Sequence, residues 1–272
     1  MCIRDRAHAP LHKPVKAADP ELSDRLNAEQ CAAVRALDQA SVVLLSGGPG
    51  TGKTSTVVEI LARAEARHPG LRIGLAAPTG KAARRLGEAV MAQRAPLPCS
   101  TLHRWLEAGS RGFGRHRQRP LELDLLVIDE MSMLDLALTQ ALLEALPSGC
   151  RMLLVGDPAQ LPPVGSGAVW HRLQQSDVRG RFGAGAVHLE RTYRNRGALA
   201  QVAQQLRQGD LAAFAADLDA LPAQANLQVH PSPLLRFPAL VRERWLERLQ
   251  QLQALTVDLN RCSEQELMAE SR

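Results

Sequence analysis

The sequence predicts an α/β fold in which a parallel sheet is flanked by helices. Short apolar runs bounded by turn residues alternate along the chain with longer stretches that have the apolar spacing of a helix. The first run, SVVLLS (41–46), enters a Gly-rich turn and is followed by the helical stretch TSTVVEILARAEARH. Strands that alternate with helices form right-handed βαβ units, which place the strands parallel to one another.

Each element can be placed by the same reasoning. We expect strands at 41–46, 71–77, 121–128, 151–156 and 186–190. We expect helices at 26–37 (with Asn27 as N-cap), 54–68, 81–94 and 136–146. Further helical stretches occur at 200–221 and 240–255. This pattern predicts a tail or linker at 1–24, an α/β domain at 25–200 and a helical extension at 201–272.

Composition excludes several classes of protein. Of 272 residues, 45% are apolar and 22% are charged, so the chain is neither fully disordered nor fibrous. The net charge of +5 permits a nucleic-acid partner without demanding one. No apolar run reaches the length of a membrane-spanning helix, and the N-terminus carries no secretory signal. The five scattered cysteines form no CxxC pair, so we expect a reducing cytoplasm, with neither a zinc module nor a disulfide scaffold.

The most informative motif is the Gly-rich turn after the first strand. It fits the pattern G-x-x-x-x-G-K-[ST] and consists of Gly47, Gly48, Pro49, Gly50, Thr51, Gly52, Lys53 and Thr54. Glycines let backbone N–H groups approach a phosphate, and the dipole of the following helix favours the anion. Lys53 would reach the β- and γ-phosphates, and the Thr54 hydroxyl would bind Mg²⁺. The motif therefore predicts binding of ATP with Mg²⁺.

An acidic pair follows the third predicted strand. Asp129 and Glu130 end the apolar run LLVIDE, which places both carboxylates at the same edge of the sheet as the Gly-rich turn. Asp129 suits the coordination of Mg²⁺, and Glu130 suits the orientation and deprotonation of an attacking water. The other interpretation of such a pair is a helix N-terminus with favourable charge.

Six stretches, taken in order, carry a family resemblance. They are SGGPGTGKTSTV, LAAPTGKAARRL, STLHRWL, LDLLVIDEMSMLDL, LLVGDPAQLPPVGSGAV and HLERTYRN, within residues 27–210. The chain resembles superfamily 1 DNA helicases with a RecA-like fold, and most of all the RecD group: the alpha subunit of exodeoxyribonuclease V and its stand-alone relatives. APTGKAARRL resembles the RecD and Pif-like branch, which implies 5′-to-3′ movement along single strands. The resemblance also implies a bacterial cytoplasmic protein.

The resemblance implies roles for further nucleotide-site residues. Gln30 resembles the glutamine that recognises the adenine edge, and Gln160 resembles the γ-phosphate sensor. Tyr193 and Arg194 resemble a pair whose ring stacks near the nucleotide and whose guanidinium meets the γ-phosphate. The alternatives are an ordinary helix amide, a loop amide that satisfies backbone groups, and an exposed arginine.

The resemblance also implies contacts to single-stranded DNA at Thr79, Lys81, Thr101 and His103. A strand-to-helix turn that presents N–H groups and a lysine suits a DNA phosphate, whereas His103 could equally be a packed structural residue. The basic loop SRGFGRHRQR (110–119) could contact or separate strands, with Phe113 stacking on a base. A solvated surface loop is the other interpretation.

Family members have a second RecA-like domain, and its motif stretches do not occur before Arg272. We therefore expect one half of a two-domain motor, with weak nucleotide binding and poor hydrolysis on its own. The implied partners are single-stranded DNA and the other two subunits of an exodeoxyribonuclease V complex, one of which would supply any nuclease activity.

Two further hypotheses compete with the helicase motor. One is a different P-loop enzyme, such as a clamp-loader-like ATPase or a nucleotide kinase. The APTGKAA turn, Gln160 and the absence of a kinase lid argue against it. The other is a nucleotide- and DNA-binding module that is active only within a larger nuclease–helicase complex. That hypothesis predicts nucleotide binding with negligible turnover.

Overall fold

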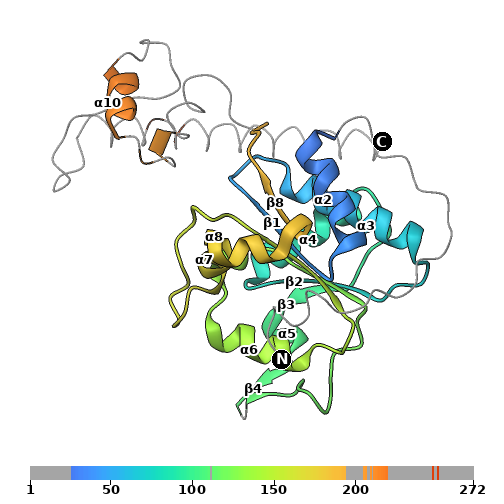
Figure 1. Cartoon of the computed structure of the whole chain (residues 1–272). Helices are drawn as coiled ribbons and strands as arrows, with labels where there is room; N and C mark the ends of the chain where they lie inside the picture. Colours follow the sequence, from blue (N-terminus) through green and yellow to red (C-terminus); the bar gives the residue numbers. More distant parts are fainter. Residues whose placement is uncertain are drawn as a thin grey trace, which may run out of the picture. The chain divides into compact units, whose positions relative to one another are not determined.

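The six-stranded parallel sheet that forms the centre of the fold confirms the predicted class (Figure 1). The computed structural model describes residues 26–110, 112–193, 205–206, 209, 211–219, 247 and 250. The strands are β1 (Val42–Gly47), β2 (Ile73–Ala77), β3 (Cys99–Thr101), β6 (Leu125–Ile128), β7 (Arg151–Gly156) and β8 (Ala186–Leu189). Their order across the sheet is β3-β2-β6-β7-β1-β8, so β1 pairs with β7 and β8 in the interior.

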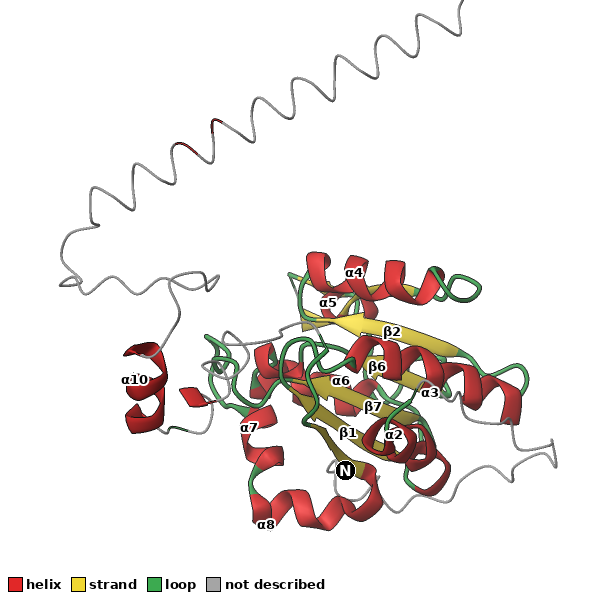
Figure 2. Cartoon of the chain, turned by 90° about the horizontal axis from the view of Figure 1, so that it is seen from above, coloured by secondary structure: helices red, strands yellow, loops and turns green. Residues whose placement is uncertain are grey.

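Helices cover both faces of this sheet (Figure 2). One face carries α2 (Ala28–Gln39), α3 (Lys53–Arg67) and α4 (Gly80–Met91). The other carries α5 (Leu102–Trp105), α6 (Leu136–Ala145) and α7 (Val169–Gln174). Shorter elements are the 3₁₀ helices η1 (Met131–Met133) and η2 (Gly180–Gly185), helix α8 (Ser176–Arg179), and the hairpin of β4 (Ala108–Gly109) and β5 (Gly112–Phe113).

Strand β1 shows why the apolar runs are continuous rather than alternating. Val42 and Leu44 belong to the core beneath α5, α6 and α7, whereas Val43 and Leu45 belong to the core beneath α2, α3 and α4. All four side chains are fully buried. Because helices cover both faces of a parallel sheet, a central strand has a nearly continuous apolar run instead of an alternating pattern. Full burial of one such side chain stabilises the fold by about 1.5–3 kcal/mol.

Polar side chains begin the helices that enter the site. Asn27 caps α2 as predicted, in a reciprocal capping box with Gln30. The Thr79 hydroxyl caps α4 by accepting from the N–H of Ala82, at 3.2 Å. These caps fix the direction in which each helix leaves the edge of the sheet.

Two strands differ from the sequence-based prediction, which also did not include α5, α7, α8 or the β4–β5 hairpin. The strand expected at 121–128 is formed only by Leu125–Ile128. Ahead of it, the N–H of Leu121 donates to the carbonyl of Ala145, and the Asp124 carboxylate accepts from the N–H of Arg72. The edge strand β3 was missed, since its three residues are too few to show a period.

The chain divides into two compact units, Met1–Asp210 and Leu211–Arg272. The sheet belongs to the first unit, and α10 (Leu211–Asp219) belongs to the second, within the helical stretch expected at 200–221. The helix expected at 240–255 lies outside the described residues, apart from two isolated positions. The predicted boundary at residue 200 stays a prediction. No helix in the described ranges is both long and apolar enough to span a membrane.

Candidate functional site

The carboxyl ends of the six parallel strands bring most of the predicted site residues to one edge of the sheet. Along this edge, β3 and β2 lead into the turns that begin α5 and α4, and β6 leads into the acidic pair. Strand β7 leads to the loop of Gln160, and β1 leads to the Gly-rich turn. The predicted DNA contacts therefore lie toward the β3 end of the edge, and the predicted nucleotide contacts lie toward the β1 end.

The Gly-rich turn is a closed loop with no room for side chains at its start. A Cβ on Gly47 would lie 2.7 Å from the Thr51 hydroxyl oxygen and 2.9 Å from the carbonyl oxygen of Leu189. Gly52 begins α3 with a φ of 84°, a conformation that favours glycine. The Lys53 ammonium donates to the carbonyls of Gly47 and Gly48, at 2.7 and 2.9 Å. The lysine therefore lies across the loop, at the N-terminus of a 15-residue helix.

Asp129 and Glu130 lie directly after β6, with unusual backbone and electrostatics. The N–H of Glu130 donates to the Asp129 carboxylate at 2.9 Å, and Glu130 has a φ of 57°. A non-glycine residue in this region costs about 1–2 kcal/mol and is typical of functional sites. Burial raises the pKa of Asp129, the Glu130 carboxylate raises it further, and Lys53 and Arg85 oppose both effects.

Gln160 follows β7 in a loop that is bonded at several points. Its N–H donates to the carbonyl of Asp157 at 3.3 Å, and its side-chain Oε1 accepts from the Ser132 hydroxyl at 2.7 Å. Ser132 belongs to η1, immediately after the acidic pair. The two loops that carry Glu130 and Gln160 are therefore joined by a short hydrogen bond.

The predicted adenine-side residues meet at the start of α2. Gln30 is only 5% exposed, and its Oε1 accepts from the N–H of Asn27 at 3.0 Å. The Asn27 amide donates to the Tyr193 hydroxyl at 3.0 Å, and the N–H of Tyr193 donates to the carbonyl of Gly50 at 2.8 Å. The ring of Tyr193 is 42% exposed. Gln30 and Tyr193 are thus brought together beside the Gly-rich turn, whereas Arg194 lies outside the described residues.

The four predicted DNA contacts occupy the adjacent turns. Thr79 and Thr101 are the N-caps of α4 and α5, and Lys81 is exposed in the first turn of α4. Because Ala77 pairs with Thr101 across β2 and β3, these turns are neighbours. The ring of His103 lies 6.5 Å from that of Phe113 in the hairpin.

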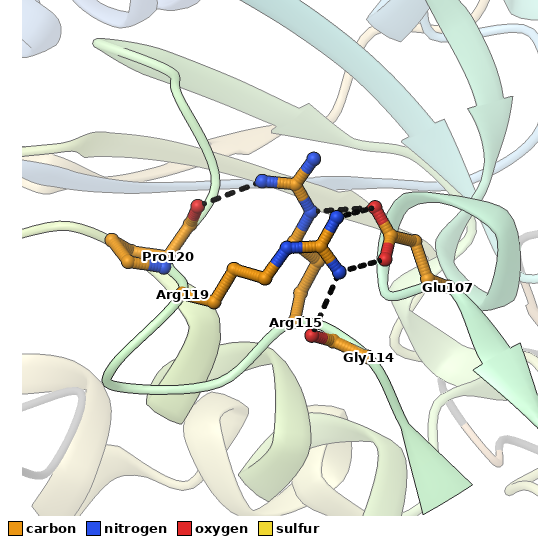
Figure 3. A network of polar contacts seen from close by, with 5 residues as sticks. All are labelled: Glu107, Gly114, Arg115, Arg119 and Pro120. Atoms are coloured by element: carbon orange, nitrogen blue, oxygen red, sulfur yellow. Dashed lines mark hydrogen bonds and ion pairs between the residues drawn. The ribbon is translucent and has the colours of Figure 1, made fainter.

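The basic loop is braced by a carboxylate at its base (Figure 3). The Glu107 carboxylate accepts from Arg115 and Arg119, which also donate to the carbonyls of Pro120 and Gly114. Hydrogen bonds from these guanidinium groups hold the pKa of Glu107 below its usual range, against a smaller opposing effect of desolvation. Two of the arginines therefore shape the β4–β5 hairpin instead of standing free in solvent.

Sequence analysis left three polar contacts of this edge unassigned. It gave no role to Ser132, which contacts Gln160, or to His171 of α7, whose Nε2 lies 3.0 Å from the Gln160 carbonyl oxygen. It placed Asn27 only as a helix cap, although its amide also contacts Tyr193. The position of Ser132 directly after the acidic pair was an available signal. Nothing in the sequence near His171 indicated its contact.

The chain is similar in sequence to known DNA helicases and helicase subunits. The chain is 42% identical over 191 residues to the ATP-dependent RecD2 DNA helicase of Deinococcus radiodurans, which covers 70% of this chain and 25% of that protein. It is 40% identical over 212 residues to the RecBCD enzyme subunit RecD of Mycolicibacterium smegmatis, which covers 71% of this chain and 37% of that subunit. The chain therefore spans about a quarter to a third of the length of these relatives.

A solved structure and a family model extend the comparison. A structure of two coordinating Pif1 helicases at forked double-stranded DNA aligns with a TM-score of 0.50 at 22% identity. The alignment covers 75% of this chain and 52% of that one, and it supports the fold alone. The model of a family described as an AAA domain matches residues 30–166, about half of the chain. The chain therefore belongs to this AAA-domain family, and it is a RecD-like member.

Proposed function

We propose that this chain is the first motor domain of an ATP-dependent 5′-to-3′ DNA helicase that acts in recombination and repair. The observation that carries the proposal is the convergence of the Gly-rich turn, the acidic pair and Gln160 at one edge of one sheet. The relatives named as RecD and RecD2 support it. The direction of movement is supported by the APTGKAARRL stretch that follows β2.

ATP would lie over the Gly-rich turn, with its base beside the start of α2. Backbone N–H groups of the turn and the Lys53 ammonium would hold the phosphates. Tyr193 offers an exposed ring for stacking, and Gln30 offers an amide for the adenine edge. The full set of ATP contacts that we propose is Gln30, Gly48, Pro49, Gly50, Thr51, Gly52, Lys53, Thr54 and Tyr193.

Mg²⁺ fits the oxygen donors at this site. The hydroxyl of Thr54 and the carboxylate of Asp129 are hard ligands of the kind that Mg²⁺ prefers. Burial and the neighbouring Glu130 carboxylate raise the pKa of Asp129, so the charged form of this carboxylate is disfavoured. A divalent cation bound there would stabilise the charged form. Bound Mg²⁺ would neutralise charge on the β- and γ-phosphates.

Hydrolysis would then depend on side chains that act on water and on the γ-phosphate. We assign Glu130 as the group that orients the attacking water and accepts its proton. Lys53 would offset charge on the transferred phosphoryl group, and the Gln160 amide would contact the γ-phosphate. The Arg194 guanidinium would make a bidentate contact with the γ-phosphate. This assignment is supported only by the sequence of residues 192–194.

Single-stranded DNA would cross the turns after β2 and β3. Thr79 and Lys81 would contact a DNA phosphate at the N-terminus of α4, with Thr101 and His103 on the next turn. The partners of the whole protein would be the other two subunits of an exodeoxyribonuclease V complex, or DNA alone in a stand-alone helicase.

The test is ATP hydrolysis by this chain with and without single-stranded DNA. Lys53→Ala should abolish binding or turnover. Glu130→Gln should keep binding and lower turnover by about 10²–10⁴-fold, the usual contribution of a general base. Glu144→Gln makes the same substitution on the exposed side of α6, where the carboxylate accepts from Gln140, and should behave like the unaltered chain.

The outcomes separate the candidate functions. DNA-stimulated turnover would support the motor domain. Nucleotide binding without turnover would indicate a module that becomes active only in a larger complex. An unaltered chain that binds no ATP analogue, or a Glu130→Gln variant that hydrolyses ATP normally, would contradict the assignments.

A further inference from the structure

Gln160 is held at both of its carbonyl groups. The Ser132 hydroxyl donates to the side-chain Oε1 at 2.7 Å, and Ser132 is fully buried. The His171 Nε2 lies 3.0 Å from the backbone oxygen. Because a carbonyl oxygen only accepts, the proton of the His171 ring must lie on Nε2. Two side chains from separate elements, η1 and α7, therefore fix the loop and the amide.

The bond from Ser132 determines which atom of the Gln160 side-chain amide remains free to contact a ligand. With Oε1 engaged by Ser132, the amide nitrogen is the remaining group, and it donates to no partner among the residues that the structure describes. An amide NH₂ is a donor and suits an oxygen anion such as a phosphate. A freely rotating amide would present its oxygen to the same anion for part of the time, which is repulsive.

The helix that carries His171 is anchored beside it by a buried side chain. The neighbouring Trp170 is fully buried, and its indole fills the space that a Cβ on Gly156 would occupy, at 2.7 Å. The Nδ1 of His171 is buried and has no hydrogen-bond partner among the described residues. The ring is therefore anchored through α7 and offers a single polar atom, which faces the Gln160 backbone.

We propose that His171 is a positioning residue that, together with Ser132, holds Gln160 so that its amide nitrogen faces the γ-phosphate of a bound nucleoside triphosphate. The proposal rests on the function proposed above. The role is indirect, since the hydrogen bond of His171 is to the backbone oxygen of Gln160 and not to its side-chain amide. Its loss should therefore weaken the preference for a triphosphate over a diphosphate and leave diphosphate affinity unchanged.

The test measures the affinities of the full chain for the Mg²⁺ complexes of AMP-PNP and ADP, and takes their ratio. His171→Leu should lower the preference for AMP-PNP by about fivefold, the effect of losing one hydrogen bond of ordinary strength. His171→Gln, whose amide nitrogen reaches the position of Nε2, should restore it. His171→Asn, whose nitrogen reaches only the position of Nδ1, should not. Arg172→Gln is the control, because Arg172 bonds to Gln175 and Asp177 rather than to the loop.

Each outcome bears on one of the two proposals. If the unaltered chain binds neither nucleotide, the proposed function fails. If it prefers AMP-PNP and both His171→Leu and His171→Gln keep that preference, only the positioning role fails. Equal losses in His171→Leu and His171→Gln would also overturn the positioning role, because packing alone would then explain the effect. We also expect Ser132→Ala to lower the preference for AMP-PNP over ADP while the affinity for ADP stays unchanged.

Discussion

Gly156→Ala is the most exacting test of how the end of β7, which leads to the loop of Gln160, is packed against α7. A Cβ at Gly156 would lie 2.7 Å from Cε2 of Trp170 and 3.0 Å from both Cζ2 and Nε1, whereas ordinary contact begins at 3.4 Å. Neither partner can retreat, since Gly156 pairs with Ser46 in the sheet and the indole is fully buried. Overpacking of this kind costs about 1–3 kcal/mol. We expect the free energy of unfolding to fall within that range.

The assay is urea unfolding of a double-mutant cycle with Trp170→Phe. The indole Nε1 is buried and has no hydrogen-bond partner in the part of the chain that the structure describes, so replacing the indole by a phenyl ring removes volume but no such bond. The smaller ring leaves room for the new methyl group, so the double variant should be more stable than the sum of the two single losses. Additive losses, or a Gly156→Ala variant within about 0.5 kcal/mol of the unaltered chain, would refute the packing argument.

Three further perturbations have signs that follow from the structure. Burial, reinforced by a nearby arginine, lowers the pKa of His188 below its unfolded value of 6.5, so its stability contribution is present above about pH 6.5 and is lost as the pH falls. His188→Gln should therefore show a smaller drop in melting temperature between pH 7.5 and pH 5.5, and an equal drop would contradict this. Asp129→Asn should raise the melting temperature of the nucleotide-free chain at pH 7, because it removes a buried carboxylate beside Glu130. Arg117 makes no ion pair among the described residues, so Arg117→Gln should lower the salt dependence of single-stranded DNA binding by about one counterion. If the slope of log affinity against log salt concentration does not change, the loop is better interpreted as a solvated surface loop.

The sequence was sufficient to predict the central strands and the residues at their ends. Continuous apolar runs identify strands that are buried on both faces, and parallel strands bring their carboxyl ends to one edge. That is why the Gly-rich turn, Asp129 and Glu130 could be placed together without a structure. Prediction failed where elements are short or where side chains override the pattern. The side chains of Asp124 and Arg72 bond to each other just before β6 begins, and β3 has too few residues to show a period.

The contacts between loops were beyond reach for a different reason. Ser132 and His171 meet Gln160 because η1, α7 and the loop after β7 are brought together by packing. No local pattern encodes such a meeting, which depends on how α7 is packed through the buried Trp170 beside His171. The contacts within the β4–β5 hairpin could not be predicted from the sequence either. Glu107 has a φ of 53° and pairs with Arg115 and Arg119, and nothing in the sequence distinguishes these arginines from ordinary surface charges.

The order of the strands bears on how a DNA strand could influence the nucleotide site. Strand β2, which leads to the Thr79 turn, pairs directly with β6, which leads to Glu130. The N–H of Asp129 donates to the carbonyl of Ala76 at 3.0 Å, three residues before Thr79. A shift of the Thr79 turn would therefore act on the acidic pair through one backbone bond. Glu130 already holds an uncommon backbone conformation, so a small displacement there changes the direction of its carboxylate. On the proposed function, coupling between DNA and hydrolysis would pass between adjacent strands, with no route through the core required.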